Sequence, residues 1–484
     1  MKKFWVPWVV GGVIFSLGLA GFGGTGVVPT VFADSSAVPG SNGSPTQNLY
    51  LPLVMRNYPL VTVFGADARS DLDKVEEAGL SWARGAMILW EQVEATKGVY
   101  NWNDDGLKAF LAEAAQRNIQ VILIVQRAPT WARKYTKACG PIKSSELDSF
   151  AKFVSEVVKR YSVPPYNVRY FQIWNEQDAP TGVPDDIGIG CWGEQSYAGD
   201  PYNGGEYFGE MLKKVYPKVK EVNPGAQVVA GALLLDCDPR GVGMGYCPDS
   251  DPNSDYHPSK WNFAEGMIRN GAAFDILAFN GYAYYAPGKT GVWQERKREK
   301  WAASGGAVDG KLNYLRSLLN KYGVNKPIML TEAGIFYGSS LNDGPTTPEY
   351  EQEKADYLVY VFANTWAQGL QATIWYSLKH LSPKLLDASN NPRPAYNALK
   401  TMTGILAQAD YKGREDQAGY AKFIYHLGNQ EIWLLIPTGE IAGTNYNISK
   451  PSNFVKLVDI YGNQLPDPGS TITFNRPTYV FRNR

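Results

Sequence analysis

Eight short apolar runs, each followed by a longer segment with helical spacing, dominate the sequence between residues 59 and 409. Strands that alternate with helices indicate parallel βα units, and eight such units in succession close a barrel. The sequence therefore predicts an α/β fold, a (β/α)8 TIM barrel over residues 59–409. The predicted strands are Val61–Gly65, Trp82–Met87, Val121–Gln126, Val168–Trp174, Val228–Leu234, Ile276–Asn280, Ile328–Thr331 and Ala372–Tyr376.

Helix end signals support this assignment. One apolar helical face ends before Gly323, a residue type common at helix C-termini, and another helix begins after Thr347, which is followed by proline. Ser145 and Asp148 form a capping-box pattern ahead of a third helix. An open, doubly wound sheet is the rival assembly, but no glycine-rich phosphate turn follows the first strand.

Helical spacing stops after about Ala409. Short alternating segments follow, separated by turn residues such as Gly462-Asn463. We expect a small C-terminal antiparallel β-sandwich over residues 410–484 that packs against the barrel. The segments are FIYHL, EIWLLIP, FVKLVDI, STITF and TYVFR.

The N-terminus resembles an export signal. Lys2 and Lys3 precede a long uncharged stretch that ends with small residues at Ala33, which predicts a signal peptide over residues 1–33. An uncleaved membrane anchor is the alternative, although the many glycines favour cleavage. Residues 34–58 are expected to be a Ser/Gly/Pro-rich linker and tether. The protein is therefore expected to be secreted or held at the cell surface, with no stable membrane insertion after cleavage.

Four cysteines agree with an oxidising compartment. Cys139, Cys191, Cys237 and Cys247 lack the CxxC spacing of zinc sites, so disulfides are preferred. Sequence leaves the pairing open, and we expect Cys237 with Cys247 and Cys139 with Cys191. Four free buried thiols are the alternative.

The charge balance favours a neutral partner. Lys+Arg and Asp+Glu both number 47 and no long run of one sign occurs, so neither nucleic acid nor an anionic membrane is indicated. Aromatic residues make up 13% of the chain, and many fall in loops where they could stack on sugar rings. Three scattered histidines suggest neither a metal site nor a catalytic triad, so no cofactor is expected. The expected oligomeric state is a monomer.

Two glutamates occupy positions suited to catalysis. Glu176 in FQIWNEQD follows the fourth predicted strand, and Glu332 in PIMLTEAG follows the seventh. Active sites of such barrels lie at the C-terminal ends of the strands, so both carboxylates are expected at the barrel mouth. A glycosidase needs an opposed pair of this kind, one to hold a proton and one to attack the sugar.

These motifs resemble those of clan A, the retaining (β/α)8-barrel glycoside hydrolases. WNE and TEAG look like the clan's acid/base and nucleophile motifs. The segment WARGAMILWEQVEATKGVYNW is similar to the second-strand region of families 5 (cellulase-like) and 39, and APTWA resembles a loop of family 39. The resemblance covers residues 60–410 as architecture and only these motifs as sequence.

The resemblance implies a role for each matched residue. Glu176 would be the acid/base and Glu332 the nucleophile that forms a glycosyl-enzyme intermediate. Asn175 would bind the sugar 2-hydroxyl, and Arg84 would keep Glu332 ionised. A buried ion pair unrelated to catalysis is the alternative for Arg84. Tyr282 matches a tyrosine that often contacts the nucleophile, and Tyr284 is a nearby substitute.

Three further positions are candidates for substrate binding. Trp375 would form the floor of the reactive subsite, while Trp131 and Asp67 are further candidates for substrate binding. The structural alternatives are ordinary packing for the two tryptophans and a salt bridge with Arg69 for Asp67. The sequence departs from many relatives at Asn280, where they carry histidine.

The leading hypothesis is hydrolysis of an oligosaccharide or polysaccharide by double displacement, with a carbohydrate as the only partner. Transglycosylation on the same scaffold is one alternative. A non-catalytic carbohydrate-binding barrel is another, although the presence of both glutamates argues against it.

Overall fold

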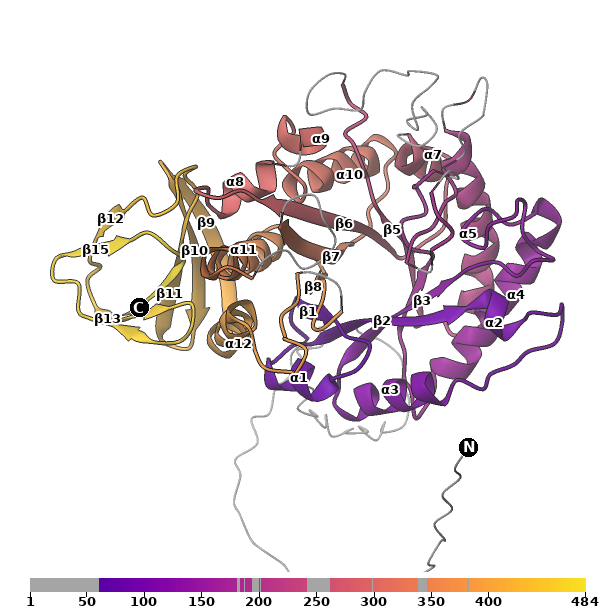
Figure 1. The fold of residues 1–484 in the computed structure, drawn as a ribbon, viewed down its shortest axis with the longest axis horizontal. Helices are drawn as coiled ribbons and strands as arrows, with labels where there is room; N and C mark the ends of the chain where they lie inside the picture. Colours follow the sequence, from indigo (N-terminus) through magenta and orange to yellow (C-terminus); the bar gives the residue numbers. More distant parts are fainter. Residues whose placement is uncertain are drawn as a thin grey trace, which may run out of the picture. The chain divides into compact units, whose positions relative to one another are not determined.

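The computed structural model describes residues 61–180, 183–186, 188–193, 200, 202–241, 262–297, 299–337, 346–380 and 383–484. Eight parallel strands form a closed barrel in which each strand pairs with the next and β8 pairs with β1 (Figure 1). The predicted barrel is confirmed, while the predicted signal peptide and linker lie outside the described residues. The strands are β1 (Phe64–Asp67), β2 (Trp82–Leu89), β3 (Gln120–Gln126), β4 (Tyr170–Ile173), β5 (Gln227–Leu233), β6 (Ile276–Tyr285), β7 (Ile328–Tyr337) and β8 (Ala372–Trp375).

Strands β1, β6 and β7 differ most from the predicted bounds, and the other strands differ by one or two residues at their ends. Strand β1 begins three residues later than Val61, which is exposed and precedes the segment that pairs with β2 and β8. Strands β6 and β7 run farther than predicted because they pair with each other as far as Tyr285 and Tyr337. Glu332 consequently lies inside β7 and not after it.

Helices surround the strands (Figure 1). The Thr347 side chain accepts a hydrogen bond from the Tyr350 amide, and Gly323 has φ +65, as the end signals predicted. The capping-box prediction at Ser145 is wrong, because a 3-10 turn (Ser144–Glu146) precedes the helix and no side chain caps it. The helices are α1 (Leu72–Glu77), α2 (Trp90–Val93), α3 (Asp105–Gln116), α4 (Leu147–Tyr161), α5 (Asn203–Val222), α7 (Phe263–Arg269), α8 (Gly291–Arg296), α9 (Glu299–Ala302), α10 (Asp309–Lys321), α11 (Pro348–Ala367) and α12 (Pro394–Leu406).

A layer of apolar side chains from β2 to β8 fills the barrel interior. Within it, the Trp82 and Tyr170 rings meet edge to face, 4.8 Å apart. Side chains two residues apart on a strand face the same side, so the next inward layer begins two positions farther along. The apolar layer comprises Trp82, Ile122, Tyr170, Val229, Ile276, Ala278, Met329, Ala372 and Ile374.

The C-terminal strands form two antiparallel sheets, which confirms the predicted β-sandwich. The larger sheet has the order β14-β13-β16-β11-β10-β9, and β12 pairs with β15 in the smaller. A separate apolar core that includes Leu435, Ile472 and Phe474 joins them. The strands are β9 (Asp410–Gln417), β10 (Tyr420–Leu427), β11 (Gln430–Pro437), β12 (Tyr446–Ser449), β13 (Phe454–Asp459), β14 (Gln464–Leu465), β15 (Thr471–Phe474) and β16 (Thr478–Asn483).

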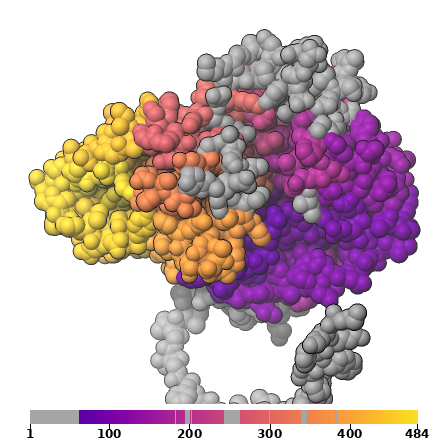
Figure 2. Space-filling view, viewed as in Figure 1, coloured from indigo at the N-terminus to yellow at the C-terminus, as the bar shows by residue number. Residues whose placement is uncertain are grey.

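The β-sandwich, yellow in Figure 2, lies against the barrel within one compact unit. Its strand β9 packs on helix α11. The ring of Trp366 lies 5.2 Å from that of Tyr425 on β10. Arg414 on β9 donates to Asn364 Oδ1 at 2.6 Å. No helix among the described residues, which begin at residue 61, is both long and apolar enough to cross a membrane.

Candidate active site

A polar layer lies above the apolar layer of the barrel, toward the carboxyl ends of the strands. Arg84, Gln172 and Asn280 stand two residues beyond Trp82, Tyr170 and Ala278 on the same strands, and all three are buried. Buried polar groups require partners. Glu332 accepts a hydrogen bond from Arg84 and Glu176 accepts one from Asn280, while Gln172 accepts one from Arg84. The strand periodicity therefore builds the site that the sequence motifs pointed to.

Arg84 is the hub of this layer. Its Nη1 donates to Glu332 Oε1 at 2.7 Å, its Nη2 to Asn175 Oδ1 at 2.7 Å, and its Nε to Gln172 Oε1 at 2.9 Å. A planar guanidinium holds three acceptors in fixed directions, which an ammonium group cannot do. The Arg84 charge thus lies directly against Glu332 and fixes the orientation of Asn175.

Glu332 has a second partner on the neighbouring strand. Tyr282 of β6 donates its hydroxyl to Glu332 Oε2, so Arg84 and Tyr282 each hold one carboxylate oxygen. Burial, followed by the nearby Glu332 and Glu176 carboxylates, raises the pKa of Tyr282 well above its usual value. The tyrosine is therefore a neutral donor, and the structure brings it together with Glu332 and Arg84.

Glu176 lies in the loop after β4. Trp174 and Glu176 have φ of +68 and +45, left-handed values that are strained for such side chains and persist only when the surroundings enforce them. Here the Glu176 amide donates to Ala232 O at 2.8 Å. Gly231 leaves room for the loop, since a Cβ there would stand 1.9 Å from Gln177 Nε2.

The carboxyl group of Glu176 differs in environment from that of Glu332. Its Oε1 accepts a hydrogen bond from Asn280 Nδ2 at 2.9 Å, and Arg84 makes no ion pair with it among the described contacts. Burial, then repulsion from Glu332, raises the pKa of Glu176 to about 8, against the opposing effect of Asn280. Glu176 is therefore suited to hold a proton at neutral pH, as a general acid must.

Asp67 also borders Arg84. The Asp67 carboxylate lies 3.8 Å from Arg84 Nη1 and 3.8 Å from Arg69 Nε. Burial raises the pKa of Asp67 to about 7 despite both arginines, with Glu332 adding to the rise. The side chain is almost fully buried, so it is placed to act on Arg84 and Glu332, and the Arg69 contact matches the salt bridge considered from sequence.

The aromatic residues at the end of β8 are arranged differently from expectation. Trp375 is fully buried, with its indole nitrogen donating to Pro383 O at 3.0 Å and its ring 6.3 Å from that of Tyr357 on α11. Tyr376 lies edge-on to Tyr282 with ring centroids 6.2 Å apart. Burial, then Glu332, raises the pKa of Tyr376 above its usual value. At the end of β8, Tyr376 and not Trp375 therefore lies on the side of the carboxylates.

Tyr284 and Trp131 lie outside this cluster. Tyr284 is half-buried two residues beyond Tyr282, and its ring is 6.1 Å from that of Phe336. Trp131 donates to Glu94 O at 3.0 Å and packs edge-on against Trp90. These contacts of Trp131 agree with the packing alternative.

A disulfide supports the loop that carries Glu176. Cys139 and Cys191 are bonded, as predicted, and the amide of Cys191 donates to Cys139 O. The adjoining Gly190 donates to Asn175 O at 2.6 Å. Cys237 is also disulfide-bonded, and its predicted partner Cys247 lies outside the described residues.

Sequence reasoning missed several supporting residues. Gln172 and Tyr376 continue the inward alternation of β4 and β8, a period-two signal that could have found them. Lys311 of α10 donates to Asn280 O at 2.8 Å, and Asp178 accepts the amides at the end of β5. Neither has a comparable signal, because both depend on contacts between distant segments. Within the described ranges, no group of three or more His, Cys, Asp or Glu is arranged to hold a metal ion.

Comparison with protein-family models gives no match, and comparison with curated protein sequences gives none either. Solved structures do match. A family 39 glycoside hydrolase from the gut symbiont Bacteroides cellulosilyticus WH2 has a TM-score of 0.59 at 16% identity, over 85% of this chain and 77% of that chain. A conserved exported protein from Bacteroides fragilis has a TM-score of 0.57 at 12% identity, over 83% of this chain and 88% of that chain.

A family 30 subfamily 8 xylanase, Xyn30A, from Clostridium acetobutylicum has a TM-score of 0.51 at 13% identity, over 88% of this chain and 96% of that chain. At these identities the likeness establishes a shared fold. The chain therefore has the fold of these solved glycoside hydrolases, as its resemblance to clan A predicted.

Proposed function

We propose that this protein is a secreted retaining glycoside hydrolase that cleaves O-glycosidic bonds of oligosaccharides or polysaccharides. The observation that carries the proposal is the unequal environment of two buried carboxylates at one barrel mouth. Glu332 is held by Arg84 and Tyr282, whereas burial and charge repulsion raise the pKa of Glu176 to about 8. The glycoside hydrolases that share the fold add support.

In the first step, Glu176 donates its proton to the departing sugar oxygen while Glu332 attacks the anomeric carbon. The bond between that carbon and the leaving oxygen breaks, and an ester to Glu332 forms. Arg84 places its positive charge 2.7 Å from Glu332 and holds the carboxylate in position for attack. Asn175, oriented by Arg84, is placed to bind the sugar 2-hydroxyl.

In the second step, the ionised Glu176 accepts a proton from water, which attacks the anomeric carbon and releases Glu332. Two inversions give retention of configuration. Asn280 contributes here, because its hydrogen bond stabilises the ionised form of Glu176. A sugar hydroxyl in place of water would give transglycosylation from the same intermediate.

A panel of chromogenic aryl glycosides and polysaccharides, assayed with wild type, Glu332→Gln and Glu176→Gln, tests the proposal. We expect wild-type turnover of at least one substrate and a fall of about 10³-fold or more in Glu332→Gln, since the variant lacks the attacking oxygen anion. A 2-fluoro glycoside should label Glu332, detected by peptide mass. Full activity in Glu332→Gln, or no turnover of any substrate by wild type, would contradict the proposal.

Added acceptor sugar separates hydrolysis from transfer. Products longer than the substrate would show transglycosylation, and binding of a polysaccharide without any turnover would favour the non-catalytic barrel. NMR of the first-formed product reports its anomeric configuration, for which we expect retention.

A further inference from the structure

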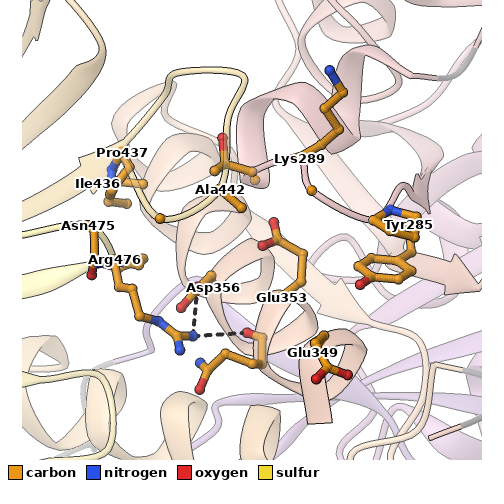
Figure 3. A pocket seen from close by; sticks show the side chains of 17 residues that line it. Tyr285, Lys289, Glu349, Glu353, Asp356, Ile436, Pro437, Ala442, Asn475 and Arg476 are labelled. Atoms are coloured by element: carbon orange, nitrogen blue, oxygen red, sulfur yellow. Dashed lines mark hydrogen bonds and ion pairs between the residues drawn. The ribbon is translucent and has the colours of Figure 1, made fainter. Parts of the chain in front are cut away.

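A cavity of about 380 Å³ lies between the barrel and the β-sandwich. The loop after β6, helix α11 and the segments that follow β11 and β15 line it (Figure 3). None of the carboxylate-cluster residues described above is among the described residues that line it. Several lining residues at its rim are exposed, including Pro287, Ala442 and Asn475, so a small molecule can enter from solvent.

Two carboxylates and one arginine form its polar side. Arg476 Nη2 donates to Asp356 Oδ2 at 2.7 Å and to Gln352 O at 3.4 Å. Glu353 extends from α11 toward the loop that carries Ala442 (Figure 3). Its Oε1 is buried without a hydrogen-bonding partner in the described part of the chain. Glu353 is itself only 9% exposed, and a polar atom buried in this way calls for a partner.

The remaining charged groups around Glu353 do not neutralise it. Lys289, across the cavity, forms an ion pair with Glu440, and Glu349 adds an exposed carboxylate at the rim. The Tyr285 hydroxyl group interacts electrostatically with Glu353 and Glu349, and Tyr461 with Asp356. Among the described residues that line the cavity, the carboxyl groups of Glu349, Glu353 and Asp356 therefore outnumber the cationic groups of Lys289 and Arg476.

Its other walls are apolar, formed by Pro287, Ile436, Pro437, Ala442 and Pro477. The neighbouring Ile441 is 67% exposed, which is unusual for isoleucine. Among the described residues that line the cavity, Glu353 Oε1, Asp356 Oδ1 and the Gln352 side-chain nitrogen are buried without a hydrogen-bonding partner. Acceptors thus outnumber donors, so the missing partner is mainly a hydrogen-bond donor.

We propose that this cavity binds a small organic ligand with a primary ammonium group, of the amino-sugar or aliphatic-amine class. An ammonium group presents three donors and no acceptor, and its charge balances Glu353. The compact body of the ligand would lie against the apolar walls. In support, burial and the adjacent Asp356 raise the pKa of Glu353 well above its usual value, so a bound ammonium group would displace a proton.

Titration calorimetry at pH 7 with glucosamine and with N-acetylglucosamine tests whether binding requires the charged ammonium group. The pair 5-aminopentanol and 1,5-pentanediol repeats this comparison with an aliphatic chain in place of the sugar ring. We expect at least one amine to bind more than tenfold tighter than its uncharged partner, with proton release detected from buffer-dependent heats. The amine that binds shows whether the cavity accepts a sugar ring or an aliphatic chain. Equal binding of charged and uncharged partners, or no binding of either amine, would overturn the proposal.

Variants locate the site. Glu353→Gln should weaken amine binding at least tenfold, while Glu332→Gln should leave it unchanged and so exclude the carboxylate cluster. Ala442→Trp, on an exposed loop, should block the cavity even if Glu353→Gln folds poorly. Glu221→Gln, an exposed change on α5, is the matched control. Loss of binding in Glu332→Gln with retention in Glu353→Gln and Ala442→Trp would reject this site, independently of glycosidase activity.

Discussion

Asn280 Nδ2 donates to Glu176 Oε1 at 2.9 Å, and the Asn280 backbone pairs with that of Glu332 on the adjacent strand. Asn280 therefore contacts both proposed catalytic residues, Glu176 through its side chain and Glu332 through its backbone. Its amide orientation is fixed, because Thr331 Oγ1 donates to Asn280 Oδ1 at 3.0 Å. A donor at this position stabilises the ionised form of Glu176 and opposes the rise in its pKa.

Removing that donor should change the pH profile. Glu176 must carry a proton in the first step, so wild-type kcat/KM should fall as pH rises through about 8. In Asn280→Ala, the pKa of Glu176 should rise further and the alkaline limb should move to higher pH. Kinetics from pH 5 to 10 measure this, with Asn270→Ala as a remote amide control. An unchanged or lowered alkaline limb would contradict the assigned contact.

The same pKa shift predicts a dependence of stability on pH. Because the pKa of Glu176 is raised in the folded state, the folded protein binds the proton more tightly than the unfolded chain. Its stabilising effect is complete below the unfolded pKa near 4.5 and is lost as pH rises toward about 8. Glu176→Gln should therefore have a higher Tm than wild type at pH 8 and a smaller difference at pH 4.5. Thermal unfolding at both values tests this, and a variant less stable at pH 8 would refute it.

The variant Arg84→Lys tests whether catalysis needs only the positive charge of Arg84 or also the fixed geometry of its hydrogen-bond donors. Lysine keeps the positive charge but cannot hold Glu332, Asn175 and Gln172 together. We expect kcat/KM to fall by about 10- to 100-fold, with Tm also reduced because buried acceptors lose their partners. Arg414→Lys on β9 is the control. Wild-type kinetics in a destabilised Arg84→Lys would favour the purely structural ion pair.

Strand positions were predictable where burial alone decides them. The predicted starts of β2, β6, β7 and β8 match the structure, since each begins with a run of buried apolar residues. The extension of β6 and β7 was not predictable, because it depends on pairing between Tyr285 and Tyr337, which are far apart in the sequence. Their glycines and tyrosines resemble loop residues when read alone.

The candidate site was predictable to the same extent. Arg84, Asn175, Tyr282 and Glu332 meet because each lies in or directly after a barrel strand that a motif marks. Trp375 was misplaced because adjacent residues on a strand face opposite sides, and a one-residue error reverses the orientation. The contact of Lys311 with Asn280 needs the tertiary structure, since a helix and a strand meet there.

Substitutions at the end of β8 distinguish the roles of the adjacent residues Trp375 and Tyr376. Tyr376→Ala should raise KM or lower kcat by about 10-fold with little loss of stability, because Tyr376 lies edge-on to Tyr282 and close enough to Glu332 to interact with its charge. Trp375→Phe should lower Tm and change kinetics less, because it removes the buried indole contact with Pro383. Kinetics and thermal unfolding of both variants decide between them. The reverse pattern would restore Trp375 as the substrate contact.

The Cys139–Cys191 disulfide should affect activity as well as stability. Its closed loop spans 52 residues and contains Glu176, so reduction is expected to cost about 2–5 kcal/mol of stability. Gly190, next to Cys191, donates to Asn175 O and so couples the disulfide to the site. The double variant Cys139→Ala/Cys191→Ala should lose activity at temperatures well below its Tm, because the strained Glu176 loop loses a constraint. Activity and unfolding measured over the same temperatures, beside wild type, test this. Activity that declines only with global unfolding would show that the disulfide stabilises the fold without positioning Glu176.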